Sequence, residues 1–240
     1  MDHGRIFLTA EWRDLVLLNY EVDPGLLFSY VPRGTELDAW NSKTFISLVG
    51  FRFANTRVLG VRVPFHSNFL EVNLRFYVKR QEHGNERRGV VFIREIVPRA
   101  AIALVARTLY NEKYVALPMA HEIHRNNEGS VDAAYRWRLG GRWSEIRFQS
   151  QGDAAPLQDG SEEQFIAEHY WGYSAQRDGR CMEYEVQHPS WKVWQARQAQ
   201  FNGDIEALYG RQFADALSGP PASAFLADGS PVTVMRGRRI

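Results

Sequence analysis

The chain has 240 residues, of which 45% are hydrophobic and 13% aromatic, so it can bury a sizeable core without disulfides or structural metals. Its formal net charge of +1 excludes a strong overall field for nucleic acid or an anionic membrane surface, and its single cysteine, Cys181, excludes an intramolecular disulfide. The longest apolar run, "AAIALVA", is far shorter than the roughly 20 residues that span a bilayer, and the N-terminal residues lack the apolar segment of a secretory signal. We therefore expect a cytoplasmic protein without a membrane or nucleic-acid partner.

The N-terminal quarter of the chain predicts a strand, a short helix and a second strand. Residues 6–20 have the composition of a strand. In "VDPGLLFSYVP", Asp23 is a typical N-cap, Pro24 suits the first helical position and Pro32 ends the segment, which predicts a short helix. The next strand is expected over 44–53.

The stretch "NFLEVNLRFYV" (68–78) is the clearest strand in the sequence, because apolar and polar residues alternate along it. One face is entirely apolar and consists of Leu70, Val72, Leu74, Phe76 and Val78. The other face is amphipathic and consists of Phe69, Glu71, Asn73, Arg75 and Tyr77. The pattern predicts that the first face packs in the core and that the second one brings Glu71 and Arg75 to a polar site.

The rest of the chain continues mainly as strands. We expect strands over 89–97, 115–125, 131–139, 142–149 and 181–188, and helices over 99–110 and 204–217. Residues 150–164, "SQGDAAPLQDGSEEQ", have the composition of a surface loop, a lid, or a boundary between two lobes of one domain. Since the strands mostly adjoin in sequence, we predict a mainly antiparallel α+β fold, closed into a barrel or sandwich, as a single domain over 1–240.

Two opposite charges, Arg94 and Glu95, interrupt the apolar stretch "GVVFIREIV". Regular alternation places Arg94 with Val90 and Phe92 on one face and Glu95 on the other, and both faces are otherwise apolar. A buried charge without a partner costs several kcal/mol, so at least one of the pair needs a counter-charge or a polar cavity. If the 68–78 strand is its neighbour, that counter-charge is available from the polar face. Two interpretations remain open: a structural salt bridge, or a cavity in which an arginine binds a carboxylate through its planar fork.

Several segments of the sequence together resemble a known protein family. They are "LTAEWRDLVLLNYEVDPGLLFSYVPRGTELD", "VPFHSNFLEVNLRFYV", "FIREIVPRAAIALVARTLYNEKYVALPM" and "MEYEVQHPSWKVW", which cover most of the chain. They resemble the YqjF-like family of uncharacterised bacterial proteins, which is grouped with the acetoacetate decarboxylases. The resemblance implies a cone-shaped, mostly antiparallel barrel with a few flanking helices around an internal cavity. This fold agrees with the strand pattern.

The resemblance also suggests which chemistry is absent. Acetoacetate decarboxylases have an Arg-Glu pair followed by Pro-Lys-Lys, in which one lysine forms a Schiff base with the keto acid. Arg94 and Glu95 match that pair, and Arg13 in "RDLVLLNYEVD" resembles an N-terminal arginine of the same family. The chain continues as "IVPRAAI", so Arg99 and Ala100 stand where the lysines are expected. An arginine stays protonated and can bind a carboxylate, but it forms no imine.

The remaining candidate residues have plain structural interpretations. Of the four lysines, Lys43, Lys79 and Lys113 are expected in solvent, and the stem of Lys192 is expected to pack on tryptophan. His66 precedes the polar-faced strand, either as a structural turn residue or at the mouth of the cavity. His121 and His124 face opposite ways on a strand, so we expect no metal site there. No cofactor is expected either.

The sequence therefore predicts a cavity that binds a small organic carboxylate or keto acid without Schiff-base catalysis. The expected ligand-binding residues are Arg94, Arg75, Arg99, Arg13, His66 and Tyr77. If the protein is an enzyme, Glu95 and Glu71 are the expected acid/base groups. Two alternatives stay open: a lyase or hydratase that uses one of these glutamates, and a non-catalytic protein whose barrel is filled by its own side chains. The oligomeric decarboxylases suggest a homo-oligomer.

Overall fold

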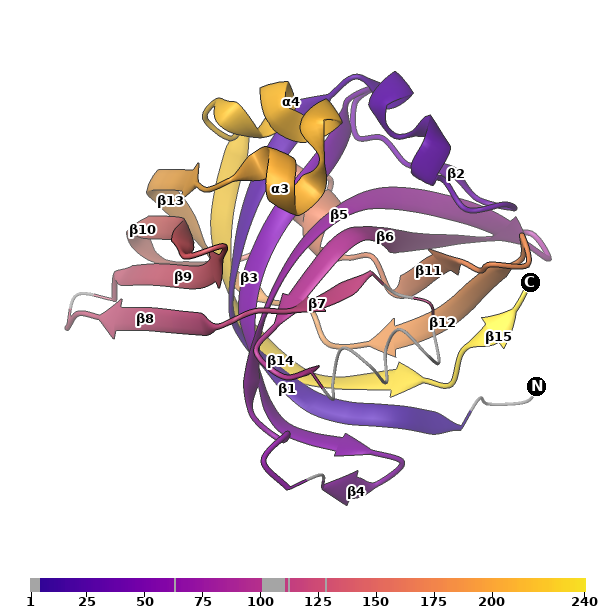
Figure 1. The fold of residues 1–240 in the computed structure, drawn as a ribbon, viewed down its shortest axis with the longest axis horizontal. Coiled ribbons are helices and arrows are strands. Elements are labelled where there is room, and N and C mark those ends of the chain that lie inside the picture. Colours follow the sequence, from indigo (N-terminus) through magenta and orange to yellow (C-terminus); the bar gives the residue numbers. More distant parts are fainter. Residues whose placement is uncertain (1–4, 63, 101–110, 112, 128) are drawn as a thin grey trace.

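The structure is a computed structural model that describes residues 5–62, 64–100, 111, 113–127 and 129–240 (Figure 1). In these residues, fifteen strands form one continuous sheet. The strands are β1 (Ile6–Val22), β2 (Glu36–Leu37), β3 (Thr44–Val58), β4 (Val61–Arg62), β5 (Phe69–Glu82), β6 (Asn85–Val97), β7 (Tyr114–Ala116), β8 (Met119–Arg125), β9 (Val131–Leu139), β10 (Arg142–Pro156), β11 (Trp171–Ala175), β12 (Cys181–Gln187), β13 (Lys192–Asn202), β14 (Ser223–Met235) and β15 (Arg238–Arg239). The short α-helices are α2 (Glu162–Ala167), α3 (Ile205–Tyr209) and α4 (Ala214–Ser218).

Seven of the strands form a closed ring. Their order is β12-β11-β6-β5-β3-β1-β14, and β14 pairs back to β12 through Val186 opposite Val234. The pairing is antiparallel throughout the described sheet except where β11 and β7 run parallel to β6. The mainly antiparallel fold expected from the sequence is therefore confirmed.

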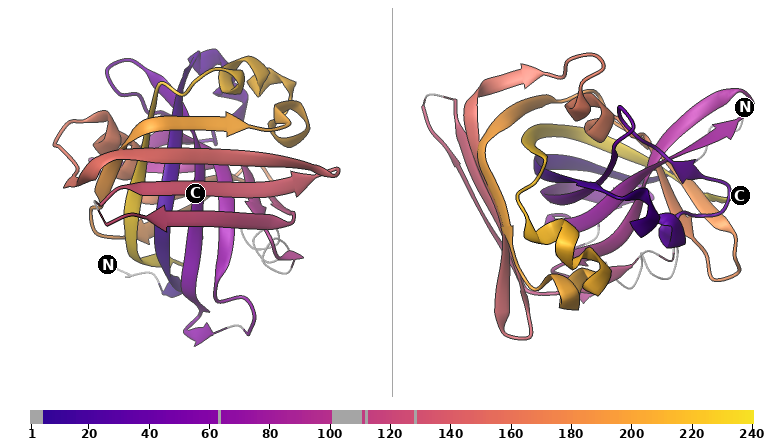
Figure 2. Two further views of the ribbon diagram at one scale, coloured as in Figure 1. Left: turned by 90° about the vertical axis from the view of Figure 1, so that its left-hand side faces the viewer. Right: turned by 90° about the horizontal axis from the view of Figure 1, so that it is seen from above.

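The strands β13, β10, β9 and β8 continue from β14 and form an outer layer across one side of the ring, where they cross β1, β3 and β5 (Figure 2). The larger hydrophobic core fills the space between the two layers, and fully buried Trp137 and Phe148 of the outer layer meet Leu48 and Leu74 of the ring there. The helices α3 and α4 cover one end of this core with Leu208 and Leu217. The ring strands thus use one face for the core, which leaves the other face for the inside of the ring.

The strand β5 confirms the alternation read from the sequence. Val72, Leu74, Phe76 and Val78 are fully buried in the core between the layers. The opposite face, which carries Glu71 and Arg75, lies toward the inside of the ring. The neighbour of β5 is β6, as the interpretation of the Arg94–Glu95 pair required.

The strand β6 departs from regular alternation. Leu74 is opposite Arg94 but the next residue, Arg75, is opposite Phe92, so Ile93 is an extra residue, a β-bulge. The bulge shifts the phase of the strand, and Glu95 consequently shares the ring-facing side with Phe92 and Val90. For this reason, the prediction from regular alternation that Arg94 shares a face with Phe92 and Val90 is wrong.

Several predicted element bounds also need correction. The expected helix over 204–217 is divided at Gly210, whose φ of 99° is outside the helical region, into α3, a 3-10 turn (Arg211–Phe213) and α4. The helix after Asp23 consists of two 3-10 turns, Pro24–Leu26 and Phe28–Tyr30.

The expected loop over 150–164 is shorter than predicted, because β10 extends to Pro156 and Ser161 already caps α2. The strands β11, β13 and β14 lie outside the strands predicted from the sequence. The helix expected over 99–110 falls almost entirely outside the described residues. No helix among the residues described is long and apolar enough to cross a membrane.

Candidate functional site

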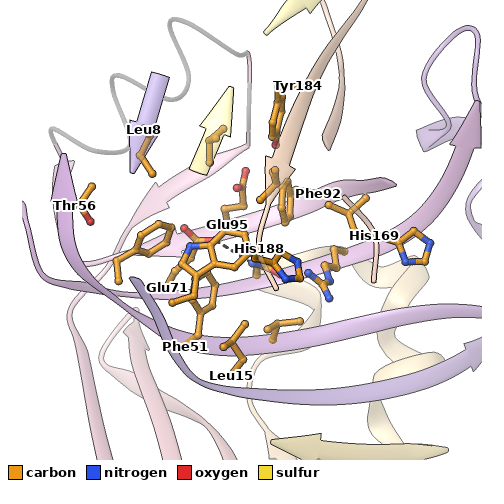
Figure 3. Close-up of a pocket in the computed structure, with 18 of the residues that line it drawn as sticks. Leu8, Leu15, Phe51, Thr56, Glu71, Phe92, Glu95, His169, Tyr184 and His188 are labelled. Carbon is orange, nitrogen blue, oxygen red and sulfur yellow. Dashed lines mark hydrogen bonds between the residues drawn. The ribbon is translucent and has the colours of Figure 1, made fainter. Parts of the chain in front are cut away.

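A pocket of about 290 Å³ lies inside the ring of strands (Figure 3). Its walls come from β1, β3, β5, β6, β7, β11, β12 and β14, from Ala167 at the end of α2 and His169 after it, and from His66, His188 and Trp191 between strands. The lining is largely aromatic and includes Trp12, Phe51, Phe53, Phe92, Trp171 and Trp191. A concave, mostly apolar site with a few converging polar groups is the usual form of a small-molecule site.

The polar groups of the pocket begin with a row along β5. Glu71, Asn73 and Arg75 occupy alternate positions, and Glu95 of β6 is directly opposite Asn73. Both oxygens of Glu71 accept hydrogen bonds, Oε1 from the Asn73 amide at 2.9 Å and Oε2 from the Tyr114 hydroxyl at 3.0 Å. Glu71 and Glu95 are therefore diagonal neighbours on one face of the sheet, and both are almost fully buried.

The environment of Glu71 changes its protonation. Burial raises the pKa of Glu71 to about 7, although the hydrogen bonds from Asn73 and Tyr114 and the charge of Arg75 act in the opposite direction. A carboxyl group with such a pKa holds and releases a proton near neutral pH, which is the requirement for a general acid or base.

Arg75 is the cationic group of the pocket wall in the described structure. One terminal nitrogen donates to the Ile166 carbonyl at 3.2 Å, and the guanidinium lies 5.6 Å from the centre of the Tyr77 ring. Among the described residues no carboxylate lies within ion-pair distance of it, and its buried Nε has no hydrogen-bond partner. An arginine held in this way is suited to bind an anion in the pocket.

His169 lies near this end of the pocket and is held by a buried carboxylate. Its Nε2 is 3.1 Å from Oδ2 of Asp38, which also accepts from Nε of Arg88 at 2.7 Å. Burial lowers the pKa of His169 to about 4, so the ring is neutral at pH 7 even though the hydrogen bond to Asp38 favours protonation. Burial alone would raise the pKa of Asp38, but the hydrogen bonds from His169 and Arg88 outweigh it and lower the pKa.

His188 is a second histidine in the pocket wall. Its ring stacks on Trp191 at a centroid distance of 4.2 Å, and Nδ1 donates to the Pro189 carbonyl at 2.9 Å. Burial lowers the pKa of His188. The neutral ring therefore has its Nε2 as a hydrogen-bond acceptor.

Buried polar atoms without a partner concentrate at this pocket. Buried polar atoms normally have a hydrogen-bond partner in the protein or in its ligand, and each exception requires an explanation. In the described part of the chain, the pocket atoms without a hydrogen-bond partner include Trp12 Nε1, Thr56 Oγ1, Asn73 Oδ1, Arg75 Nε and His169 Nδ1. A polar ligand would supply these partners.

The structure brings four of the residues predicted from the sequence together. Glu71, Glu95, Arg75 and His66 all line the pocket. His66 is half-buried, and its Nδ1 is 2.8 Å from the Pro64 carbonyl. Sequence alternation was sufficient to group Glu71 with Arg75.

The other four predicted residues lie elsewhere. Arg94 faces the core between the layers, and its Nε donates to the Leu208 carbonyl at 3.1 Å, because the bulge in β6 turns Glu95 to the pocket instead. Arg13 pairs with Glu11 outside the pocket, and Arg99 is exposed. Tyr77 is fully buried and does not line the pocket, and its hydroxyl is 2.6 Å from Ser47 Oγ.

None of the four lysines lines the pocket in the described structure. Lys43 pairs with Glu21 and Lys79 lies near Glu36 and Glu86. Lys113 lies over the Tyr30 ring, and Lys192 is exposed.

Sequence reasoning missed His169 and Tyr114 and assigned His188 only to a strand end. The only available signal was the aromatic residues around "HYWGY" and "HPSWKVW", which are as common in a core as in a pocket. Their positions depend on the ring closing and on the turn after α2.

A family model for DUF2071, described as an uncharacterized conserved protein, matches residues 9–231. The uncharacterized protein YqjF of Bacillus subtilis (strain 168) is 28% identical over an alignment of 145 residues, and the match covers 55% of this chain and 58% of that relative. The match thus spans less than two thirds of that relative's length.

Solved structures with the same fold cover nearly the whole chain. The acetoacetate decarboxylase of Legionella pneumophila has a TM-score of 0.66 at 12% identity and covers 98% of this chain and 88% of its own. The enduracididine biosynthesis enzyme MppR, complexed with pyruvate, has a TM-score of 0.67 at 13% identity over 99% and 91% of the two chains. An acetoacetate decarboxylase-like enzyme from Sphingomonas wittichii RW1 has a TM-score of 0.64 at 13% identity, and the match covers 98% of this chain and 93% of that one. Since the family model spans most of the sequence, the chain belongs to the DUF2071 family, and its fold is that of the acetoacetate decarboxylase-like proteins.

Proposed function

We propose that the protein binds a small organic carboxylate with an apolar or aromatic body inside the ring of strands, with Arg75 as the anchor. The observation that carries this proposal is the Arg75 guanidinium, which lines the pocket with no carboxylate at ion-pair distance among the described residues. Leaving a cation partly buried and uncompensated is costly, and an anionic ligand removes that cost.

The shape and lining of the pocket support a ligand of this class. The cavity of about 290 Å³ suits a small molecule, and the aromatic side chains surround this space rather than fill it. This disfavours the alternative of a purely structural protein with a filled interior. The pyruvate complex of MppR has the same fold with a small carboxylate bound.

Binding would be non-covalent. A Schiff base requires an amine, and none of the four lysines lines the pocket in the described structure. The Arg99 and Ala100 found in place of the decarboxylase lysines are consistent with this interpretation.

A second candidate function is an acid/base reaction of the bound acid, of the lyase or hydratase type. The specific observation in its favour is Glu71, which is buried in the pocket with a pKa of about 7 and is oriented by Asn73 and Tyr114. In this reaction Glu71 would transfer the proton and Arg75 would hold the carboxylate.

The test is a thermal-shift screen of 2- and 3-keto acids, hydroxy acids and aromatic carboxylates against three proteins. These are the wild type, Arg75→Met and Arg94→Met. Arg94 is a matched control because it lies beside the same strand but faces the core. A ligand at 100 times its Kd adds roughly 2.7 kcal/mol of stability, which a thermal shift detects easily.

We expect shifts with wild type and Arg94→Met and none with Arg75→Met. Equal shifts with Arg75→Met, or silence across the panel, would overturn the proposal. For any acid that is turned over, Glu71→Gln is expected to abolish turnover and to retain binding. Undiminished turnover would exclude Glu71 as the acid/base group.

A further inference from the structure

The position of His169 restricts which carboxylates fit. Its side chain is 1% exposed and is enclosed by Tyr77, at a ring distance of 4.7 Å, and by the edge-on ring of Phe165 at 5.1 Å. Arg75 binds the Ile166 carbonyl, three residues before His169, so the anchor and the histidine belong to the same end of the pocket. Packing on both sides leaves the imidazole little freedom to rotate.

The tautomer of His169 follows from its partner. Asp38 is nearly buried and also accepts from Arg88, which keeps the carboxylate ionised. An ionised carboxylate only accepts, so Nε2 of His169 must carry the proton of the 3.1 Å hydrogen bond. In the neutral ring Nδ1 is then an acceptor, and it is the buried nitrogen with no partner among the described residues.

A second acceptor belongs to the same row as Arg75. The amide nitrogen of Asn73 donates to Glu71, so its Oδ1 is the remaining atom, and it is buried without a partner in the described structure. The unpartnered hydroxyl of Thr56 lies at the opposite side of the pocket from His169 (Figure 3). Next to the carboxylate anchor, the pocket therefore presents hydrogen-bond acceptors.

We propose that the pocket selects carboxylates whose neighbouring carbon carries a hydrogen-bond donor, so that it binds a 2-hydroxy acid in preference to the matching 2-oxo acid, with His169 as the selecting residue. This inference rests on the proposed carboxylate site. The hydroxyl of a 2-hydroxy acid donates to Nδ1 of His169. The oxygen of a 2-oxo group can only accept, so its lone pair repels that of Nδ1 and both atoms stay without a hydrogen bond.

The experiment compares mandelate, benzoylformate and phenylacetate, which share a phenyl group and a carboxylate and differ at the carbon between them. Neither carbon next to the keto carbon of benzoylformate carries a hydrogen, so this acid cannot form an enol that would itself donate. Affinities are measured by calorimetry at about pH 7. We expect mandelate to bind roughly 10- to 100-fold more tightly than benzoylformate, as is typical when a buried polar group loses its partner.

The variant His169→Phe keeps the ring and its packing but removes the acceptor. It is expected to reduce the mandelate-to-benzoylformate preference to about 1. The matched control is His121→Phe, because His121 stacks on Tyr135 outside the pocket. This substitution is expected to leave the preference unchanged. A preference that survives in His169→Phe would overturn the role of His169.

Nitrogen NMR of the wild type provides a test that does not depend on whether the variant folds. The ¹⁵N shifts of His169 are expected to show a protonated Nε2 and an unprotonated Nδ1, and the Nδ1 signal is expected to move with mandelate but not with benzoylformate. A protonated Nδ1 would overturn the inference.

The outcomes separate this inference from the proposed function. If none of the acids binds the wild type, the carboxylate site itself is wrong. If the acids bind and require Arg75 but benzoylformate binds as tightly as mandelate, the site stands and the selection by His169 is wrong.

Discussion

Glu71 illustrates how a single carboxyl group couples the pocket to pH. Its pKa is about 7 in the folded protein, mainly through burial, against 4.5 for an exposed glutamate. Between these two values the unfolded chain has released the proton and the folded protein still holds it. The contribution of Glu71 to stability therefore falls as the pH rises from 4.5 to about 7, and it is constant above that range.

The variant Glu71→Gln, which resembles the protonated carboxyl group, is expected to lack this dependence. As the pH rises from about 5 to about 8, the unfolding free energy of the wild type is expected to fall by roughly 1–3 kcal/mol relative to that of the variant. Urea unfolding at a series of pH values measures it. Parallel pH profiles of the two proteins would show that Glu71 titrates normally.

Arg75 and Arg94 show why sequence patterns identify some site residues but not others. Both are arginines on neighbouring strands and both are compatible with binding an anion. Alternation places Arg75 correctly because β5 is regular, whereas the bulge at Ile93 turns Arg94 toward the Leu208 carbonyl. Of the arginines expected to bind the carboxylate, we therefore propose Arg75 and not Arg94 as the anchor.

At the scale of elements, the pairing of β11 with β6 depends on Gly89. A Cβ at this position would lie 2.6 Å from the Trp171 carbonyl oxygen and 2.6 Å from the Tyr173 ring. Trp171 is opposite Gly89 in this parallel pair and also lines the pocket. The absence of a side chain thus allows β11 to approach and to complete the ring.

The substitution Gly89→Ala is expected to destabilise the protein by roughly 1–3 kcal/mol, since the backbone of β11 must move. It is also expected to weaken ligand binding through the displacement of Trp171. The control is Gly219→Ala, because a Cβ there meets nothing within 4 Å. Thermal unfolding and ligand titration measure both effects, and a Gly89→Ala protein as stable as the control would contradict the steric argument.

At the scale of the whole molecule, two hydrophobic cores share the same strands. The core between the layers and the one inside the ring both include residues of β1, β3, β5 and β6. Neither core can lose its packing without exposing a face of these strands. The molecule is therefore expected to behave as one cooperative unit.

Urea unfolding is accordingly expected to be a single transition. Far-UV circular dichroism follows the sheet, and tryptophan fluorescence follows all seven tryptophans, which include Trp137 between the layers and Trp12 and Trp191 at the pocket. The two signals are expected to have the same midpoint. Separate midpoints would indicate that the outer layer of β8, β9 and β10 unfolds independently.

The sequence by itself determined the features that depend on neighbouring residues. The alternation in "NFLEVNLRFYV" separates a core face from a face with Glu71 and Arg75, and the succession of strands indicates a mainly antiparallel sheet. Through the resemblance to the acetoacetate decarboxylases, the residues after Glu95 also suggest that Arg99 and Ala100 stand where the lysines of those enzymes are expected. These properties are local, so one stretch of chain contains all the information they need.

Only the tertiary structure decided how the site is assembled. The bulge that brings Glu95 into the pocket depends on the register of β6 against β5, and the ring closes between Val186 and Val234, which are far apart in sequence. The acceptor nitrogen of His169 exists because Asp38, 131 positions away, holds the other nitrogen. Register, closure and the tautomer of a buried histidine all depend on contacts between distant segments, and no local pattern in the sequence encodes them.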